Sequence, residues 1–250
     1  MRRPSLRSSA ARVRVKSGQG ILQIVKIGWL CFLGIWGIVL LASAQDVQRQ
    51  STLQPDVQRL ARAVDDHYNH LHSLEGEFTE TYRGEGMERV ESGTLWLKKP
   101  RKMRWEYRSP KEKLFVSDGQ TVWFYVPAER QLRKTEFRKL DDIRSPIAFL
   151  LGKTKLEKEL QGLSLAPDIA PLTPGEVVLR GVPTALADQV SEIVLEISPD
   201  NRITRIVVQS VDGAATEYRF TGQKEDLAIA DGRFGFKPPA GTEIVDAGLE

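Results

Sequence analysis

The stretch SGTLWLKKPRKMRWEY, residues 92–107, decides the fold. It contains two runs in which large apolar and polar side chains alternate, joined by a basic corner that ends at Pro100. Because proline cannot donate to a β-ladder, Pro100 marks the point where one strand stops and the next begins. On the second strand Met103, Trp105 and Tyr107 share one face, since side chains alternate along a strand. The pattern predicts two adjacent strands with a broad apolar face that needs a covering layer.

Alternation with a period of two continues along most of the chain after Leu74. The Asp-Gly pairs at 118–119 and 212–213 favour tight turns between strands, and so does Pro-Asp-Asn at 199–201. Between Pro55 and Leu74, apolar residues instead recur every three to four positions, which is the spacing of one buried helix face. The sequence therefore predicts an N-terminal helix followed by a long antiparallel meander.

Residues 145–152, SPIAFLLG, interrupt the alternation. Serine is a good N-cap, proline suits the first helical position, and glycine suits the position after a helix end. The pattern predicts a short helix that is apolar nearly all round. The following residues 153–162, KTKLEKELQG, predict a second, surface helix with Leu156 and Leu160 on its inner side.

One helix covers little of a sheet this wide, so the sheet has to curl to bury its apolar face. Around ten strands that close partway on themselves would leave a concave interior. An ordinary sheet-on-helix core is one explanation of the aromatic side chains. The other is an apolar cavity stoppered by the short helix. This second interpretation assigns the cavity lining to Trp96, Met103, Trp105, Tyr107, Phe115, Trp123 and Tyr125. It assigns the lid to Ile147, Phe149, Leu150 and Leu151.

The first 44 residues have the composition of an export signal. They contain seven Lys or Arg and no Asp or Glu, with an apolar run at 27–41 that leads into Ala-Ser-Ala at 42–44. A basic region, a short apolar run and an A-x-A site are typical of a cleaved signal peptide. The alternative, a permanent membrane anchor, needs about 20 apolar residues. We expect cleavage near Ala44 and export of a single domain over residues 45–250.

Composition argues against several classes of function. Without residues 1–44 the chain carries 29 basic and 33 acidic side chains, a net charge of −4. A nucleic-acid-binding protein needs a concentrated basic face, and the sequence contains no such cluster. The only cysteine, Cys31, lies inside the apolar run. The mature protein would therefore have no disulfide, no thiolate nucleophile and no Cys-based zinc site.

The three histidines, His67, His70 and His72, cluster at the end of the predicted helix. Imidazole suits zinc, but no further His or Cys exists to complete a closed site. The alternative is a polar helix end, where histidine is favourable near the negative end of the helix dipole. The nucleophile motif G-x-S-x-G is absent, and no other enzyme signature is found. We expect no metal, no cofactor and no enzymatic activity.

Four stretches, GTLWLKKPRKMRWEY, SDGQTVWFY, SPIAFLLG and GRFGFKPPAGTEIVD, together resemble the periplasmic outer-membrane lipoprotein carrier family, LolA. The resemblance extends from about Val57 to Asp246. It implies a mainly β fold with α elements, an unclosed antiparallel β half-barrel of about ten or eleven strands. An N-terminal helix and a short helical lid would lie over an apolar cavity. The resemblance also implies a carrier that binds the acyl chains of lipoproteins released from the inner membrane and takes them to the outer membrane.

The resemblance implies partners as well. In the family an inner-membrane ABC transporter of the LolCDE type loads the carrier, and LolB or an equivalent acceptor at the outer membrane unloads it. We expect the carrier to be a monomer. An arginine commonly precedes the proline of the strand corner in this family and holds the lid closed. This chain has Lys99 there, which keeps the charge but not the planar guanidinium fork, and the latch role is assigned to Lys99.

Three related functions remain open. Periplasmic regulators of the RseB type sense lipoproteins with the same half-barrel, but they carry a second domain for which this chain has little room. An acceptor like LolB needs a cysteine at the mature N-terminus, and Ala44-Gln45 lacks one. A general lipid or glycolipid shuttle built on this fold is compatible with the sequence.

Overall fold

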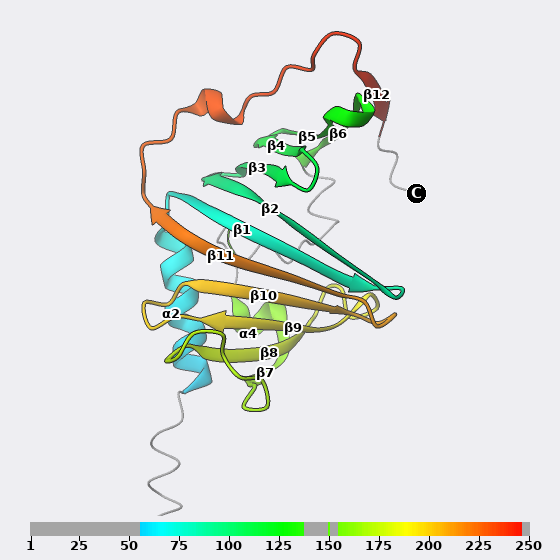
Figure 1. Ribbon diagram of the computed structural model, residues 1–250. Coiled ribbons are helices and arrows are strands. Elements are labelled where there is room, and N and C mark those ends of the chain that lie inside the picture. The colour runs from blue at the N-terminus through cyan, green and yellow to red at the C-terminus, as the bar shows by residue number, and fades with distance from the viewer. Residues whose placement is uncertain (1–55, 138–149, 151–154, 247–250) are drawn as a thin grey trace, which may run out of the picture. The chain divides into compact units, whose positions relative to one another are not determined.

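The computed structural model describes residues 56–137, 150 and 155–246 of the chain. These residues contain a single sheet of twelve strands (Figure 1). The strands are β1 (Ser73–Gly84), β2 (Met87–Lys98), β3 (Lys102–Ser109), β4 (Lys113–Asp118), β5 (Thr121–Val126), β6 (Gln131–Glu136), β7 (Leu160–Leu165), β8 (Val177–Pro183), β9 (Val190–Ile197), β10 (Ile203–Ser210), β11 (Ala215–Glu225) and β12 (Glu243–Asp246).

Across the sheet the strands follow the order β12-β6-β5-β4-β3-β2-β1-β11-β10-β9-β8-β7. β1 lies in the middle and pairs with both β2 and β11. Neighbouring strands are antiparallel except β12 and β6, which are parallel. Within the described residues the two edge strands, β12 and β7, do not pair with each other. The predicted unclosed sheet is confirmed, with twelve strands instead of ten or eleven and with one parallel pair.

Helix α2 (Val57–His70) begins where the sequence predicts it. The Asp56 carboxylate caps it, accepting hydrogen bonds from the backbone N–H groups of Gln58 at 3.0 Å and Arg59 at 3.3 Å. These are two of the four N–H groups that the first turn of a helix leaves without an internal partner. The cap therefore fixes Val57 as the first helical residue, two residues after Pro55, which lies outside the described residues.

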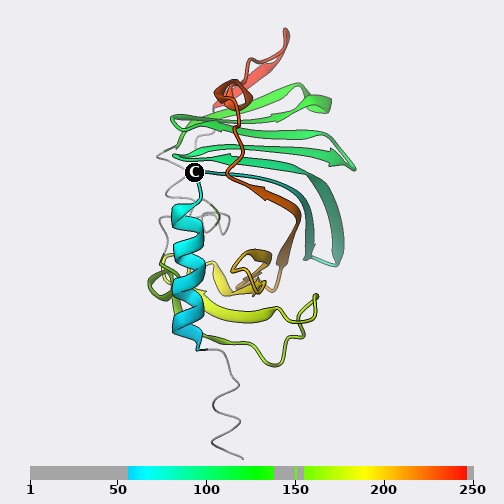
Figure 2. The same ribbon diagram turned by 90° about the vertical axis from the view of Figure 1, so that its left-hand side faces the viewer.

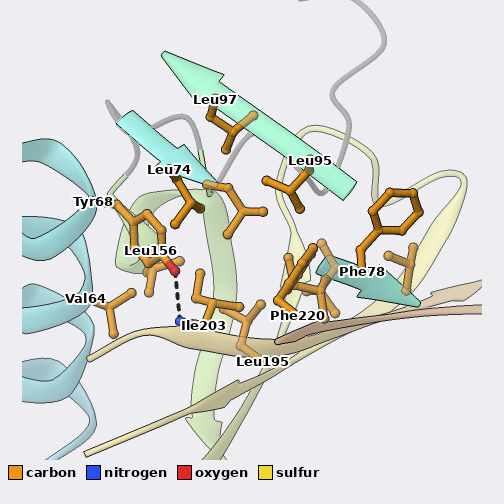
Figure 3. Packing of buried hydrophobic residues seen from close by; sticks show 14 of the residues in the cluster. Val64, Tyr68, Leu74, Phe78, Leu95, Leu97, Leu156, Leu195, Ile203 and Phe220 are labelled. Atoms are coloured by element: carbon orange, nitrogen blue, oxygen red, sulfur yellow. Dashed lines mark hydrogen bonds between the residues drawn. The ribbon is translucent and has the colours of Figure 1, made fainter. Parts of the chain in front are cut away.

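The buried face of α2 consists of Ala61, Val64 and Tyr68. Their spacing of three and four residues is the helical period predicted from the sequence. Tyr68 Oη accepts a hydrogen bond from the backbone N–H of Ile203 at 3.0 Å, which satisfies both groups inside the core (Figure 3). The helix is thereby joined to β10 by a polar contact as well as by packing.

Helix α4 (Leu156–Glu159) is a single turn. The prediction of a helix to residue 162 was wrong, because β7 begins at Leu160 and pairs with β8. Gly162 has a φ of +68°, in the left-handed region that a helix interior does not use. Leu156 and Leu160 are nonetheless both buried in one cluster, as predicted.

The two faces of the sheet carry different clusters of apolar residues. We call the face covered by α2 the inner face, and it bears the main cluster, which includes Val64 of the helix and Leu74, Trp105 and Phe220 of the sheet. Figure 2 shows the strands curving around this side. Figure 3 shows side chains of the helix and the strands pointing toward one another across it. The inner face is thus the concave interior expected from a sheet that curls.

The opposite, outer face is covered in two places. After β11 the chain crosses the outer face of the β2–β4 half, where Ile229 and Phe234 bury Trp96; Phe234 ends the short helix η3 (Asp231–Phe234). Asp231 forms ion pairs with Lys98 at 2.7 Å and Lys102 at 2.9 Å. These contacts hold the C-terminal segment on the sheet.

The second covered area of the outer face lies over β8 to β11. Glu196 is fully buried there and forms an ion pair with Arg205 at 3.1 Å. Its other oxygen accepts backbone hydrogen bonds from Leu172 at 2.5 Å and Thr173 at 3.2 Å, in the loop between β7 and β8. A buried charge needs such partners because it has lost its water. The loop is therefore tied to the sheet through Glu196.

All described elements belong to one compact unit, Pro55–Glu250. In the described part of the chain, no helix combines the length and the apolar composition needed to cross a bilayer. The predicted signal peptide at 1–44 lies outside the described residues, as do the predicted lid residues Ile147, Phe149 and Leu151.

Candidate functional site

Aromatic rings from three strands form the floor of the inner face. Phe78 of β1 lies with its ring 4.7 Å from Trp105 of β3 and 4.9 Å from Tyr107. Trp105 also contacts Tyr218 and Phe220 of β11, each with ring centroids 6.3 Å apart. The tilted and edge-on angles, 60–78°, are those that aromatic quadrupoles prefer. We call these five residues the aromatic floor.

Four of the seven predicted cavity residues lie on this inner face. Met103 and Trp105 belong to the main cluster, and Tyr107 and Phe115 pack against it. The register explains their common orientation: Trp105 is directly opposite Phe115 on β4 and opposite Leu95 on β2. Cross-strand partners point to the same side of a sheet.

The other three predicted cavity residues lie on the outer face. Trp96 is opposite Arg104, and both alternate with inner-face residues. On β5, Trp123 is opposite Val116, one position away from Phe115, and Tyr125 is two residues beyond Trp123 on the same face. The seven predicted residues therefore do not line one cavity, because they divide between the two faces of the sheet.

Trp96 and Tyr125 have partners of their own on the outer face. Trp96 Nε1 donates a hydrogen bond to Glu75 at 2.8 Å, and the Arg233 guanidinium lies 4.5 Å from the Trp96 ring centre. The Tyr125 ring lies 5.4 Å from Phe236. Of these three contacts, one comes from β1 and two come from the C-terminal segment, so these rings anchor the outer cover. The sequence TLWLK at 94–98 already indicates that both faces of this strand are covered, because apolar Leu95 and Leu97 alternate with apolar Trp96.

Several inner-face residues were missed by the sequence prediction. They come from β1, β2, β9, β10 and β11, and they are Phe78, Leu95, Ile193, Leu195, Ile206 and Phe220. Most of them lie between residues 161 and 227, where the resemblance rests on strand rhythm alone. Their positions follow from the pairing of β1 with β11, a contact between the two ends of the meander.

Leu150 is the one predicted lid residue that the structure describes. It is 2% exposed and belongs to the main cluster. A small pocket beside it is lined by Leu71, Leu74, Leu97 and Lys99, among others. Leu150 therefore lies on the inner face, at the end of the sheet near the C-terminus of α2.

Lys99 connects the strand corner to that same end of α2. Its Nζ donates hydrogen bonds to the backbone carbonyl oxygens of Tyr68 and of Asn69, the latter at 3.1 Å. The last carbonyls of a helix lack internal partners and carry the negative end of the helix dipole, so an ammonium group is favourable there. Lys99 and Leu150 both line the small pocket. The latch role of Lys99 toward the lid stays a prediction.

We predict that Lys99→Met lowers the free energy of unfolding by about 1–2 kcal/mol, because the helix C-terminus loses a charged hydrogen-bond donor. Urea denaturation followed by circular dichroism measures this. Lys99→Arg is the matched control and should retain most of the stability, since it keeps the charge and the donors. Equal losses in both variants would show that the fit of the lysine side chain, rather than its charge, matters.

Between the aromatic floor and the hairpin turn that joins β1 to β2, the inner face carries polar side chains. Tyr107 Oη donates a hydrogen bond to Glu80 Oε2 at 2.8 Å. Burial raises the pKa of the Glu80 carboxyl, and the neighbouring Glu91 carboxylate adds to this. Burial and Glu80 raise the pKa of Tyr107, which is thus fully protonated at neutral pH and remains a donor.

The three histidines have separate partners. His67 Nε2 lies 3.0 Å from Glu225, His70 Nδ1 lies 2.7 Å from the carbonyl oxygen of Asp66, and His72 Nδ1 lies 3.4 Å from Asp226. Among the described residues, no three His, Cys, Asp or Glu side chains are grouped so as to hold a metal ion. His67 and His72 therefore join α2 and the residue before β1 to the end of β11, whereas His70 bonds within α2.

The chain is similar to known outer-membrane lipoprotein carrier proteins. The family model described as "Outer membrane lipoprotein carrier protein LolA" matches residues 69–237. An outer-membrane lipoprotein carrier protein from Alkalilimnicola ehrlichii is 31% identical over 186 residues, covering 73% of this chain and 81% of the relative. One from Nitrosospira multiformis is 27% identical over 156 residues, covering 62% and 72%.

A solved structure shows the same fold. It is an uncharacterized conserved protein from Thermus thermophilus, with a TM-score of 0.50 at 14% sequence identity, and the match covers 77% of this chain and 99% of that chain.

Proposed function

Because the chain belongs to the LolA family of outer-membrane lipoprotein carrier proteins, we propose that it binds the acyl chains of lipoproteins on the inner face of its sheet. It carries them through the periplasm from the inner membrane to the outer membrane. It acts as a chaperone and catalyses no reaction.

The observation that carries this proposal is the burial of Leu150 in the main cluster of the inner face. Most other residues of the cluster lie in α2 or in strands of the sheet, which backbone hydrogen bonds hold in place. Leu150 instead belongs to the short apolar segment 145–152. Because Leu150 is not part of a strand, it can leave the cluster without breaking the sheet, and the surface it uncovers is apolar. Acyl chains then take its place.

The energetics require such an exchange. Burying hydrocarbon is worth about 0.8 kcal/mol per CH₂, so a chain of sixteen carbons gains roughly 12 kcal/mol. Three such chains would exceed the practical limit of non-covalent affinity, about −20 kcal/mol, and the cargo would not be released. A lid that occupies the inner face of the empty carrier lowers the apparent affinity by the fraction of molecules that are open.

The partners follow from the family. A LolCDE-type ABC transporter in the inner membrane loads the carrier, and LolB or an equivalent acceptor at the outer membrane unloads it. Export with cleavage of residues 1–44 near Ala44 would deliver the carrier to the periplasm as a monomer. The basic and apolar composition of residues 1–44 supports this.

A release assay tests the proposal. Spheroplasts that display a radiolabelled triacylated lipoprotein on the inner membrane are incubated with the purified protein, and the soluble fraction is analysed. We expect the lipoprotein to appear in solution in a one-to-one complex with the protein. Serum albumin controls for unspecific extraction. A folded protein that releases no more lipoprotein than albumin does would contradict the proposal, and lipid alone in the complex would favour a lipid shuttle.

A further inference from the structure

The inner face changes character toward the β1–β2 hairpin, across two neighbouring rows of side chains. Glu80 on β1 and Glu91 on β2 are directly opposite each other, and Tyr218 on β11 is opposite Glu80 on its other side. In the neighbouring row, Tyr107 on β3 is opposite Gly93 on β2 and Lys113 on β4. The Tyr107 hydroxyl reaches Glu80 across this step. We call five of these residues the polar row: Glu80, Glu91, Tyr107, Lys113 and Tyr218. It borders the aromatic floor directly, because Tyr107 and Tyr218 belong to both.

The polar row is held together by charged contacts. Lys113 Nζ lies 2.5 Å from Glu91, and the Arg89 guanidinium lies 3.3 Å from the other oxygen of the same carboxylate. Glu91 is buried beneath these two cations, with 4% of its surface exposed. Among the described residues, Glu80 takes part in one side-chain hydrogen bond, which its Oε2 accepts from the Tyr107 hydroxyl. Glu80, Tyr107 and Tyr218 are partly exposed and are the polar groups that a ligand on the inner face meets.

Stability does not explain this row. Two carboxylates directly opposite each other in a sheet repel, and burial disfavours the charge on Glu80. Apolar side chains at these positions would extend the aromatic floor without a loss of stability, since replacing buried charged groups by well-packed apolar ones is often neutral or stabilising. Partly buried titratable groups in such surroundings are common at functional sites.

The position of the row matches the length of an acyl chain. Along β2, the step from Glu91 to Leu97 spans about 20 Å at 3.3 Å per residue. The hydrocarbon core of a bilayer is about 30 Å thick, so one leaflet of acyl chains needs about 15 Å. A chain of that length that starts at Glu91 therefore ends beyond Leu95, about 5 Å short of Leu97. Over Phe78, Trp105 and Phe220 its ester or amide group would lack hydrogen-bond partners, because these side chains are apolar.

We propose that the polar row is the subsite for the ester and amide linkages of the acylated cargo, and that the acyl chains extend from it over the aromatic floor toward Leu97. The Tyr218 hydroxyl donates to an ester carbonyl, and Glu80 Oε1 accepts the amide N–H. The row thereby sets the direction of the cargo: polar linkages at the β1–β2 hairpin end, methyl ends toward the lid. This inference rests on the proposed function.

Two ligands test the subsite in the full-length protein. One is a synthetic triacylated lipopeptide with ester and amide linkages; the other is N-phenyl-1-naphthylamine, an uncharged apolar dye without them. The dye's dissociation constant comes from its fluorescence, and that of the lipopeptide from displacement of the dye. We expect Tyr218→Phe to weaken lipopeptide binding about tenfold, the value of one hydrogen bond, and to leave dye binding unchanged.

Tyr82→Phe is the matched control. Tyr82 lies on the same face of β1, two residues beyond Glu80, and it is opposite Arg89 outside the polar row. It should change neither constant. Tyr107→Phe is a second test variant and should show the same selective loss as Tyr218→Phe. Thermal unfolding of each variant confirms that it is folded.

The remaining outcomes separate the two proposals. Lipopeptide binding that is unchanged in both test variants, or reduced equally with dye binding, would overturn the subsite while the carrier function stands. If the wild-type protein binds the dye and the lipopeptide does not displace that dye, the proposed function is overturned, and the subsite with it.

Discussion

Leu150→Asp should make the protein bind triacylated cargo about a hundredfold more tightly. Leu150 is buried in the main cluster, beside Leu71, Leu74 and Leu97. Losing the burial of a leucine costs about 1.5–3 kcal/mol, and a carboxylate in its place adds a penalty for desolvation. The closed form therefore loses about 3 kcal/mol, while the open form that binds cargo is unaffected. Each 1.4 kcal/mol is a factor of ten in apparent affinity.

The affinity is measured by displacement of an apolar dye by a triacylated lipopeptide. Transfer of lipoprotein from the variant to an acceptor should slow correspondingly, because release depends on the lid returning. Val211→Asp is the control: Val211 is 59% exposed at the turn between β10 and β11, so the same chemical change there should alter neither quantity. Unchanged cargo affinity in Leu150→Asp would contradict the assignment of the lid.

Trp105→Ala should lower the free energy of unfolding by about 4 kcal/mol, within the 3–5 kcal/mol typical of truncating a large buried aromatic residue. Trp105 is 2% exposed and contacts Phe78, Tyr218 and Phe220, so the variant loses both packing and three aromatic pairs. Urea denaturation followed by circular dichroism gives the difference.

Trp105→Phe is the matched control and should lose less than half as much, since a smaller ring keeps part of the contact area. The midpoint should shift without a change in the slope of the transition, because the variant still folds to the same sheet. A loss below 1 kcal/mol in Trp105→Ala would show that the aromatic floor is not a packed part of the fold.

The strands and their turns could be predicted from the sequence because alternation and turn residues are local signals. The structure confirms hairpin turns at the Asp-Gly pairs 118–119 and 212–213, between β4 and β5 and between β10 and β11. The length of α4 could not be predicted in this way. A spacing of four between Leu156 and Leu160 satisfies a helix, yet the pairing of Leu160 with Pro183 of β8 ends the helix there.

The faces of the aromatic residues were harder to predict. Trp96, Trp123 and Tyr125 were grouped with Trp105 by their chemical type, although strand alternation and pairing place them on the other side of the sheet. Trp96 can be buried on the outer face because Ile229 and Phe234, far along the chain, cover it there. Apolar residues on both faces of a strand indicate that both faces are covered, and this pattern is visible in residues 94–98.

The polar row could not be found from the sequence at all. Glu80, Glu91, Tyr107, Lys113 and Tyr218 belong to five strands, and none of them follows a motif. The register of β1 with β2 and with β11 aligns Glu80, Glu91 and Tyr218. Tyr107 and Lys113 join them through a hydrogen bond to Glu80 and an ion pair with Glu91. Single glutamates and tyrosines in alternating strands are otherwise typical of solvent-exposed positions.

The central claim, that acyl chains lie on the inner face, is tested most directly by tryptophan quenching with a lipopeptide whose acyl chains carry bromine. Trp105 on the inner face and Trp96 on the outer face are buried to a similar degree and provide a matched pair. A chain that begins at Gln45 lacks the tryptophans of the first 44 residues, and Trp123→Phe with either Trp96→Phe or Trp105→Phe leaves one tryptophan. We predict strong quenching of Trp105 and none of Trp96. Quenching of Trp96 alone, or of neither residue with the lipopeptide bound, would contradict the account.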